Sequence, residues 1–137
     1  MSSQANRATA PRLRSLAKSL LVHETSRKKS AAAKSPPVLH VTEKLHPHLA
    51  NLMGNSGFRA LLSRALALAS AEVSWLRAVH VDARGTLEGL EVLHAQFTAS
   101  DFAEGEIVLL VELLALLEAL IGPALTSRLV GETWPQI

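Results

Sequence analysis

Residues 102–130 read FAEGEIVLLVELLALLEALIGPALTSRLV, and this stretch decides the fold of the chain. From Ile107 to Ile121 every residue is Ile, Val, Leu or Ala except Glu112 and Glu118. Leu and Ala are strong helix formers, so the stretch predicts one long helix. Its leucines cover about half of the helix circumference, opposite a narrow strip that holds the carboxylates. A helix this apolar is normally enclosed by protein on most of its sides.

Two neighbouring signals mark where this helix is expected to begin and to bend. Asp101 followed by Glu104 fits a capping box, with Asp in the place of Ser or Thr. Gly122 and Pro123 are expected to kink or break the helix, and a last helical segment is expected to reach Val130.

The length and the charges of this stretch argue against a membrane-spanning role. The fifteen residues from Ile107 to Ile121 would form about 22 Å of helix, whereas the hydrocarbon core of a bilayer is about 30 Å thick. The two carboxylates would also be costly inside a span. We therefore expect no transmembrane segment, and we expect the helix to lie in a protein core or an oligomer interface.

Shorter periodic segments predict further helices in the body of the chain, which begins near Val38. Thr42 is expected to cap a helix over residues 43–53, and Gly54 is expected to end it. Apolar residues at a spacing of 3.6 predict a second helix over residues 57–73.

Residues 76–82 change to an alternation of apolar and polar side chains. The sequence Asp82-Ala83-Arg84-Gly85 is typical of a turn, so Thr86 to Leu90 is expected to pair back as a hairpin. The alternative is a loop that leads into a short helix over residues 87–96, and we favour a small hairpin or irregular turn that is followed by a helix. The whole pattern predicts a mainly α fold, a compact four- or five-helix bundle with a small β-hairpin near residues 77–90.

The net charge of +2 hides two unlike parts of the chain. Residues 1–37 hold eight Lys and Arg against Glu24 alone, a net charge of +7, whereas residues 38–137 hold six against eleven Asp and Glu, a net charge of −5. This asymmetry is typical of a basic arm on an acidic body. We therefore divide the chain into a basic, partly disordered leader (1–37) and a helical domain (38–137), with a short amphipathic helix over about residues 11–24.

The basic leader has four interpretations. Clustered Lys and Arg can neutralise nucleic-acid phosphates without reading sequence. The acid-free start of the chain also fits a targeting sequence, and the amphipathic helix fits a segment that docks on a partner or a membrane surface. In the fourth interpretation Leu13, Leu16 and Leu20 dock on the body and the charges are solvated. The nucleic-acid hypothesis would use Arg7, Arg12, Arg14, Lys18, Arg27, Lys28, Lys29 and Lys34.

Few residues favour catalysis or metal binding. The chain has no Cys, which excludes disulfides, thiolate zinc sites and a Cys nucleophile. His46 and His48 would point the same way in an extended segment and could share a metal ion, but no third ligand follows at a recognised spacing. Glu112 and Glu118 could act as an acid/base pair, although a solvated strip is the simpler interpretation. We expect no metal, no cofactor and no enzymatic activity.

The surplus of leucine in the long helix favours self-association, most simply as a symmetric dimer. Arg128 projects into the leucine face of an unbroken helix and could pair there with a buried carboxylate, whereas a kink at Gly122 would turn it to solvent. The expected oligomer or partner interface consists of Leu109, Leu113, Leu116, Leu117, Leu120 and Arg128.

Three stretches of the body carry a resemblance to other sequences: GFRALLSRAL (57–66), EVSWL (72–76) and GTLEGL (85–90). With the ending Trp134-Pro135, they resemble a group of small uncharacterised bacterial helical proteins over residues 42–135 and not over the leader. Those proteins usually carry another residue at the position of Pro123. The resemblance implies a bacterial, cytoplasmic protein and brings no known activity with it.

These observations predict a non-catalytic helical interaction or regulatory module that self-associates through its C-terminal apolar helix and binds an unidentified protein partner. One alternative is a nucleic-acid-associated protein that uses its basic arm. Another is a small metal-dependent enzyme built around His46 and His48.

Overall fold

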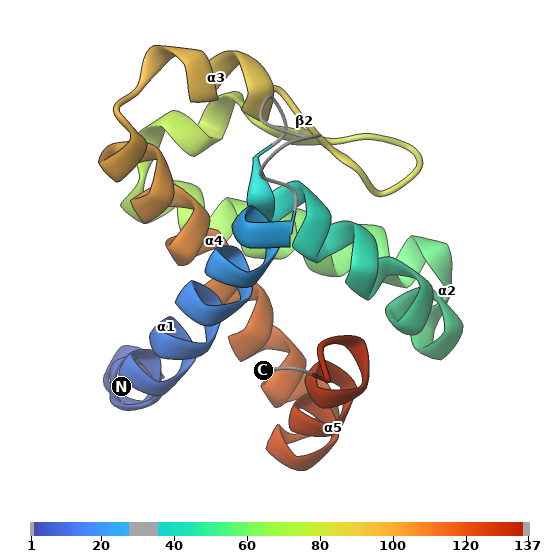
Figure 1. Ribbon diagram of the computed structural model, residues 1–137. Helices are drawn as coiled ribbons and strands as arrows, with labels where there is room; N and C mark the ends of the chain where they lie inside the picture. The colour runs from blue at the N-terminus through green and yellow to red at the C-terminus, as the bar shows by residue number, and fades with distance from the viewer. Residues whose placement is uncertain (1, 28–35, 136–137) are drawn as a thin grey trace.

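The computed structural model describes residues 2–27 and 36–135 and has the expected mainly α fold with a small β-hairpin. The five helices of these residues pack around one apolar core, to which every helix contributes buried side chains. Figure 1 shows the hairpin and the short third helix at one end of the molecule and the last helix at the other. The elements are α1 (Ser2–Arg27), α2 (Pro37–Glu72), the 3-10 helix η1 (Ser74–Ala78), β1 (His80–Val81), β2 (Leu87–Glu88), α3 (Leu90–Gln96), α4 (Ala99–Ile121) and α5 (Pro123–Thr133).

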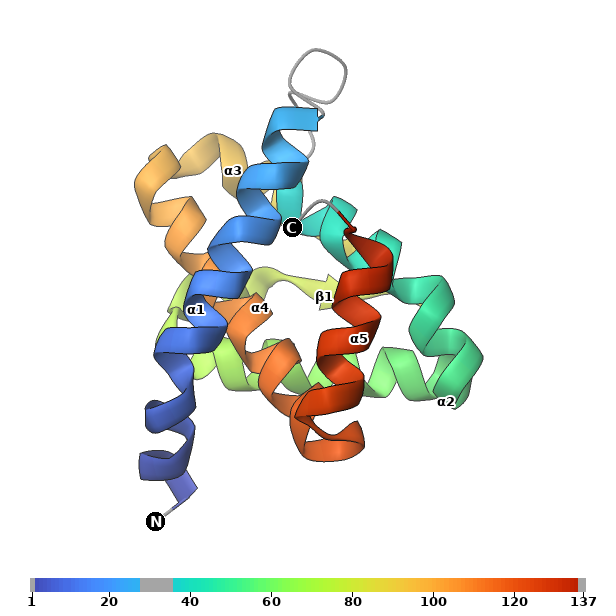
Figure 2. The same cartoon turned by 60° about the horizontal axis from the view of Figure 1, so that its bottom comes forward.

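The long apolar helix α4 is the centre of the fold, as its sequence predicted. It contacts α1, α2 and α5, and Figure 2 shows it between α1 and α5. Burying such a helix on several sides removes a large apolar area from water, which is the main favourable term in folding. The leucines of α4 that are fully buried are Leu109, Leu110, Leu113, Leu114 and Leu117.

Helix α4 begins at a side-chain cap and ends at a glycine. The helix is capped by Thr98, whose hydroxyl oxygen accepts a hydrogen bond from the Asp101 N–H at 3.1 Å. The capping box predicted at Asp101 was therefore wrong, because the cap lies three residues earlier and Asp101 is already in the first turn of α4. The predicted break at Gly122 is confirmed: this glycine has a φ of 92°, and α5 begins at Pro123.

Helix α2 is longer than the sequence indicated. It begins at Pro37, in the first helical turn, where a proline is well tolerated. Thr42 was predicted as its cap but lies inside it, buried, with its hydroxyl donating to the Leu39 carbonyl oxygen at 3.0 Å. The interruption predicted at Gly54 is present as a kink, where this residue adopts a φ of 78°.

The predicted hairpin is confirmed and is very short. Val81 pairs with Leu87 in antiparallel register, and His80 pairs with Glu88. The Asp82 carboxylate closes the turn by accepting hydrogen bonds from the N–H groups of Arg84 and Thr86, each at 2.9 Å. These bonds satisfy backbone donors that a turn would otherwise leave unpaired.

Helix α1 begins at Ser2 and is longer than the amphipathic helix expected over residues 11–24. Its apolar face is built into the core through the buried side chains of Leu13, Ala17 and Leu20. This helix contacts both α2 and α4, which corresponds to the docked interpretation of the leader. The division of the chain at residue 37 remains a prediction, but it does not separate α1 from the common core.

An aromatic cluster supports the start of α4. The ring of Trp75 stacks on Phe97 and on Phe102, with centroid distances of 5.2 Å and 5.1 Å. The Trp75 ring also lies directly against the backbone of Gly105, where a Cβ atom would overlap it. Glycine at this position lets the indole approach the helix.

No helix within residues 2–27 and 36–135 is long and apolar enough to cross a membrane.

Candidate interaction surface

An apolar groove lies between the second half of α2 and the end of α4. Its volume is about 450 Å³, and its lining is almost entirely apolar. The groove is lined by Met53, Gly57, Ala60, Leu61, Arg64, Leu116, Ala119 and Leu120.

The shape of the groove follows from the sizes of these side chains. Gly57, Ala60 and Ala119 leave room between the two helices, because each has at most one side-chain carbon. Leu120 stands at the groove with 62% of its surface exposed, although a leucine gains about 1.5–3 kcal/mol from full burial. A molecule that filled the groove would bury this leucine.

The structure separates the predicted interface residues into two groups. Leu109, Leu113 and Leu117 are fully buried within this chain, so they stabilise its core and offer no surface to a partner. Leu116 and Leu120 line the groove. The predicted interface was wrong for the first three, because the other helices of this chain, which pack against α4, already bury them.

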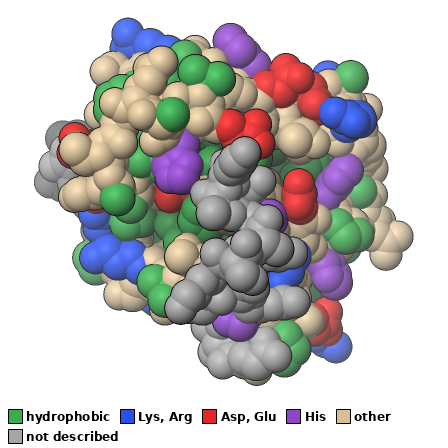
Figure 3. Space-filling model, turned by 45° about the horizontal axis from the view of Figure 1, so that its top comes forward, with side chains coloured by type: hydrophobic (Ala, Val, Ile, Leu, Met, Phe, Trp, Pro, Cys, Tyr) green, Lys and Arg blue, Asp and Glu red, His purple; other side chains and the backbone are tan. Residues whose placement is uncertain are grey.

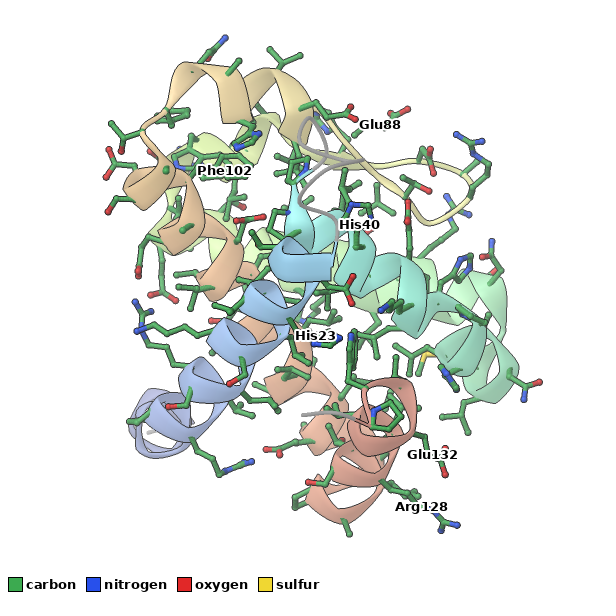
Figure 4. All side chains as sticks on the ribbon, viewed as in Figure 1. His23, His40, Glu88, Phe102, Arg128 and Glu132 are labelled. Atoms are coloured by element: carbon green, nitrogen blue, oxygen red, sulfur yellow. The ribbon has the colours of Figure 1, made fainter. Side chains whose placement is uncertain are left out.

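Arg128 is not a buried charge. Its side chain is 73% exposed and lies 3.5 Å from Glu132 on the same helix. Figure 4 shows both residues on the outer side of α5. The break at Gly122 turns this residue to solvent, which decides between the two orientations considered from the sequence.

Five of the eight residues that line the groove come from α2, and the interface predicted from the sequence did not include them. After the kink at Gly54, the residues Gly57, Ala60 and Arg64 recur every three or four positions, so they share one face of that part of the helix, and Met53 precedes the kink. The available signal was the run of small residues on the side opposite the buried Leu62 and Leu66.

Two arginines of the basic leader form ion pairs with glutamates of α4. Arg12 donates two hydrogen bonds to the Glu118 carboxylate, at 2.6 Å and 2.9 Å, and Arg14 donates to Glu104. The hydrogen bond from Arg14 holds the pKa of Glu104 below its usual value, although desolvation opposes the effect. Lys18 is exposed. The side chains of the other predicted phosphate-binding residues, Arg7, Arg27, Lys28, Lys29 and Lys34, lie outside the described residues.

The visible charges do not form a basic surface. On the face of Figure 3, Lys and Arg side chains are scattered among acidic side chains and histidines. Binding to nucleic-acid phosphates depends on clustered positive charge, and the nucleic-acid alternative stays a prediction.

The histidine pair predicted for a metal lies on a helix and not on an extended segment. His46 stacks on Phe58 with a centroid distance of 4.6 Å, and its Nε2 lies 2.8 Å from the Asn55 amide oxygen. Residues two apart on a helix point in nearly opposite directions, which separates His46 from His48. The described part of the chain contains no group of three His, Cys, Asp or Glu residues arranged to hold a metal ion.

Two buried acids were missed by sequence analysis. Glu24 is fully buried, and its Oε2 accepts hydrogen bonds from Lys44 Nζ at 2.5 Å and from the Trp134 indole at 2.8 Å. Glu106 of α4 is buried and accepts a hydrogen bond from the N–H of Val38, at the start of α2, at 3.1 Å. Both acids hold helices together.

A second, polar hollow of about 400 Å³ lies between the start of α2 and the hairpin. His40 lines it, and its Nε2 is buried without a hydrogen-bond partner among the described residues. Figure 4 shows His40 on α2 and Glu88 on the hairpin side of the molecule. The rest of the lining includes Arg84 and several carboxylates, so the hollow combines both signs of charge.

Comparison of the chain with models of known protein families, with curated proteins and with solved structures finds no match. The resemblance of residues 42–135 to small bacterial helical proteins remains a prediction, as does a cytoplasmic location.

Proposed function

We propose that this chain is a non-catalytic helical interaction module that binds protein chains, its own copies among them, through the groove between α2 and α4. The observation that carries the proposal is the groove itself, an apolar hollow bordered by the exposed Leu120. An apolar groove of this kind can bind the apolar face of a helix, whose side chains recur every three or four residues.

The form of self-association differs from the one expected from the sequence. Only the last turns of α4 contribute, through Leu116 and Leu120, and α2 supplies the opposite wall. A partner that filled the groove would bury Leu120 and the small residues beside it. Apolar burial of this kind drives most protein association.

The non-catalytic part of the proposal draws support from how the buried acids are used. Glu24 and Glu106 are the buried carboxylates of the described residues, and each is engaged by groups of a neighbouring helix. A catalytic carboxylate would instead need access to a substrate.

The test compares two matched charge insertions by sedimentation velocity of the full chain over a wide concentration range. Leu120 and Val92 are almost equally exposed, at 62% and 64%, but Val92 lies on α3 and does not line the groove. We expect the wild-type chain to self-associate, Leu120→Asp to abolish the association, and Val92→Asp to leave it unchanged.

Circular dichroism of each variant verifies that the fold is intact. A wild-type chain that stays monomeric at every concentration would contradict self-association. If Leu120→Asp and Val92→Asp weakened self-association equally, the groove would not be the site of self-association.

A further inference from the structure

One exposed face of α2 continues from the groove toward the end of that helix. Arg64, Leu68 and Glu72 recur at every fourth position along it, so they form one ridge. The neighbouring ridge consists of Ser63, Ala67 and Ala71, which are all small and exposed. We call these six residues the α2 face.

The charges of the α2 face are of opposite sign and lie two turns apart. Arg64 makes no ion pair with any residue in the described ranges. Glu72 lies against Glu112 of α4, and burial together with this second carboxyl raises the pKa of Glu112. Arg14 is the other charge near Glu72, and it donates its hydrogen bond to Glu104 instead.

Leu68 lies midway between the two charges and is 37% exposed. A two-fold axis through this position would set a second α2 antiparallel to the first. Each Arg64 would then lie opposite the partner's Glu72, and Leu68 would meet the partner's Leu68. An interface with two-fold symmetry requires self-complementarity of this kind, in which one patch serves both copies.

The small side chains make the approach sterically feasible. Helix axes can come within about 8 Å where the contact residues are small. Ser63, Ala67 and Ala71 would let the partner's α2 lie close to this one. A cation opposite the two carboxyls would also relieve the repulsion between Glu72 and Glu112.

We infer that a second copy of this chain binds across the α2 face, antiparallel to α2, with Arg64 of each copy opposite Glu72 of the other. The inference rests on the proposed function, because Arg64 also lines the groove and the two surfaces are continuous. The partner is then a second copy of the chain, and the Arg64–Glu72 pairs set the register of the two α2 helices.

The test is a charge exchange in the full chain, followed by sedimentation velocity. In Arg64→Glu alone, the new carboxylate faces the partner's Glu72, and in Glu72→Arg alone two arginines face each other. Each single variant is expected to raise the dimer dissociation constant at least about tenfold, because juxtaposed like charges are costly.

The equimolar mixture of these two variants is expected to restore the dimer to within about threefold of the wild-type dissociation constant. In the mixed dimer every arginine again faces a glutamate. The double variant R64E/E72R is expected to dimerise with itself for the same reason. Arg128→Glu is the control, because it reverses an exposed charge on α5 and should leave association unchanged.

Single variants that dimerise like the wild-type chain, or a mixture that stays monomeric, would overturn this arrangement. If Leu120→Asp abolishes the association while both charge reversals leave it intact, the groove proposal stands and the antiparallel α2 contact fails. A monomeric wild-type chain would overturn both.

Discussion

The indole Nε1–H of Trp134 donates a hydrogen bond of 2.8 Å to the Glu24 carboxylate, although 110 residues separate the two side chains. Lys44 of α2 donates to the same oxygen at 2.5 Å. One fully buried carboxylate therefore joins α1, α2 and the end of α5. The other oxygen of Glu24 is buried without a partner among the described residues, so this acid depends on Lys44 and Trp134.

The first prediction concerns the Lys44–Glu24 pair. Lys44→Met is expected to lower the free energy of unfolding by about 3–5 kcal/mol, because it leaves a buried carboxylate without its cation. The double variant K44M/E24L is expected to cost less than K44M alone, since it removes the buried charge as well. Urea unfolding at pH 7 measures both. A double variant that loses as much as the sum of the two single variants would contradict this coupling.

The contribution of the Glu24 carboxylate to stability should depend on pH. Burial raises the pKa of Glu24, but the hydrogen bonds from Lys44 and Trp134 outweigh it and hold that pKa below its ordinary value. The contribution of Glu24 to stability is therefore present above its unfolded pKa and is lost as pH falls through the lower folded pKa. Part of the acid unfolding of the wild-type chain should disappear in the variant K44M/E24L.

The sequence predicted most helices and turns because their signals are local. The leucine run of α4, the break at Gly122 and the turn at Asp82 each depend on residues within a few positions of one another. Thr98 was missed as a cap because Asp101 offered a similar pattern three residues later. Pro37 was assigned to the leader from the sequence, yet it occupies the first turn of α2.

The polar contacts of the core could not be predicted in the same way. Arg12 meets Glu118 and Glu24 meets Trp134 across more than 100 residues, and helical periodicity carries no information about such pairs. Glu106 follows Glu104 in the sequence with only Gly105 between them, yet one is buried and the other is paired with Arg14 at the surface. The α2 wall of the groove could not be predicted for the same reason, since it depends on how two distant helices pack.

Glu106 gives the second prediction. Burial raises the pKa of Glu106 to about 7 from an ordinary value of 4.5, and the hydrogen bond from the Val38 N–H opposes that shift only in part. Between these two pH values the folded chain holds a proton that the unfolded chain has released. The contribution of Glu106 to stability therefore falls as pH rises through this window, by roughly 3 kcal/mol at most.

Glu106→Gln removes this titration and retains an oxygen that can accept from the Val38 N–H. The variant is expected to be about as stable as the wild-type chain at pH 4.5 and more stable at pH 8, as measured by urea unfolding. Stability curves that run parallel from pH 4.5 to pH 8 would show that Glu106 titrates normally in the fold.

A third prediction compares two helical glycines. Alanine is favoured over glycine in a helix by up to about 1 kcal/mol. Gly131→Ala in α5 should show this gain, because a Cβ atom there meets open space. Gly105→Ala should instead lower stability by about 1–3 kcal/mol, because its Cβ would overlap the Trp75 ring.

The cause of the Gly105 effect can be tested directly. Trp75→Phe removes the part of the indole that would collide, so G105A/W75F should lose less than the sum of the single variants by thermal unfolding. Additive losses would mean that the indole is not the obstacle.

The last prediction concerns how α1 is held to the body. Leu13 is fully buried, so Leu13→Ala should cost about 2–5 kcal/mol through lost burial and the cavity left behind. Arg12→Ala removes an ion pair in which the arginine is 54% exposed and should cost less than about 1 kcal/mol, because water and salt screen it. In 1 M NaCl the loss caused by Arg12→Ala should nearly vanish, while the loss caused by Leu13→Ala should persist. If Arg12→Ala were the more damaging change, electrostatic attraction and not apolar packing would hold α1 in place.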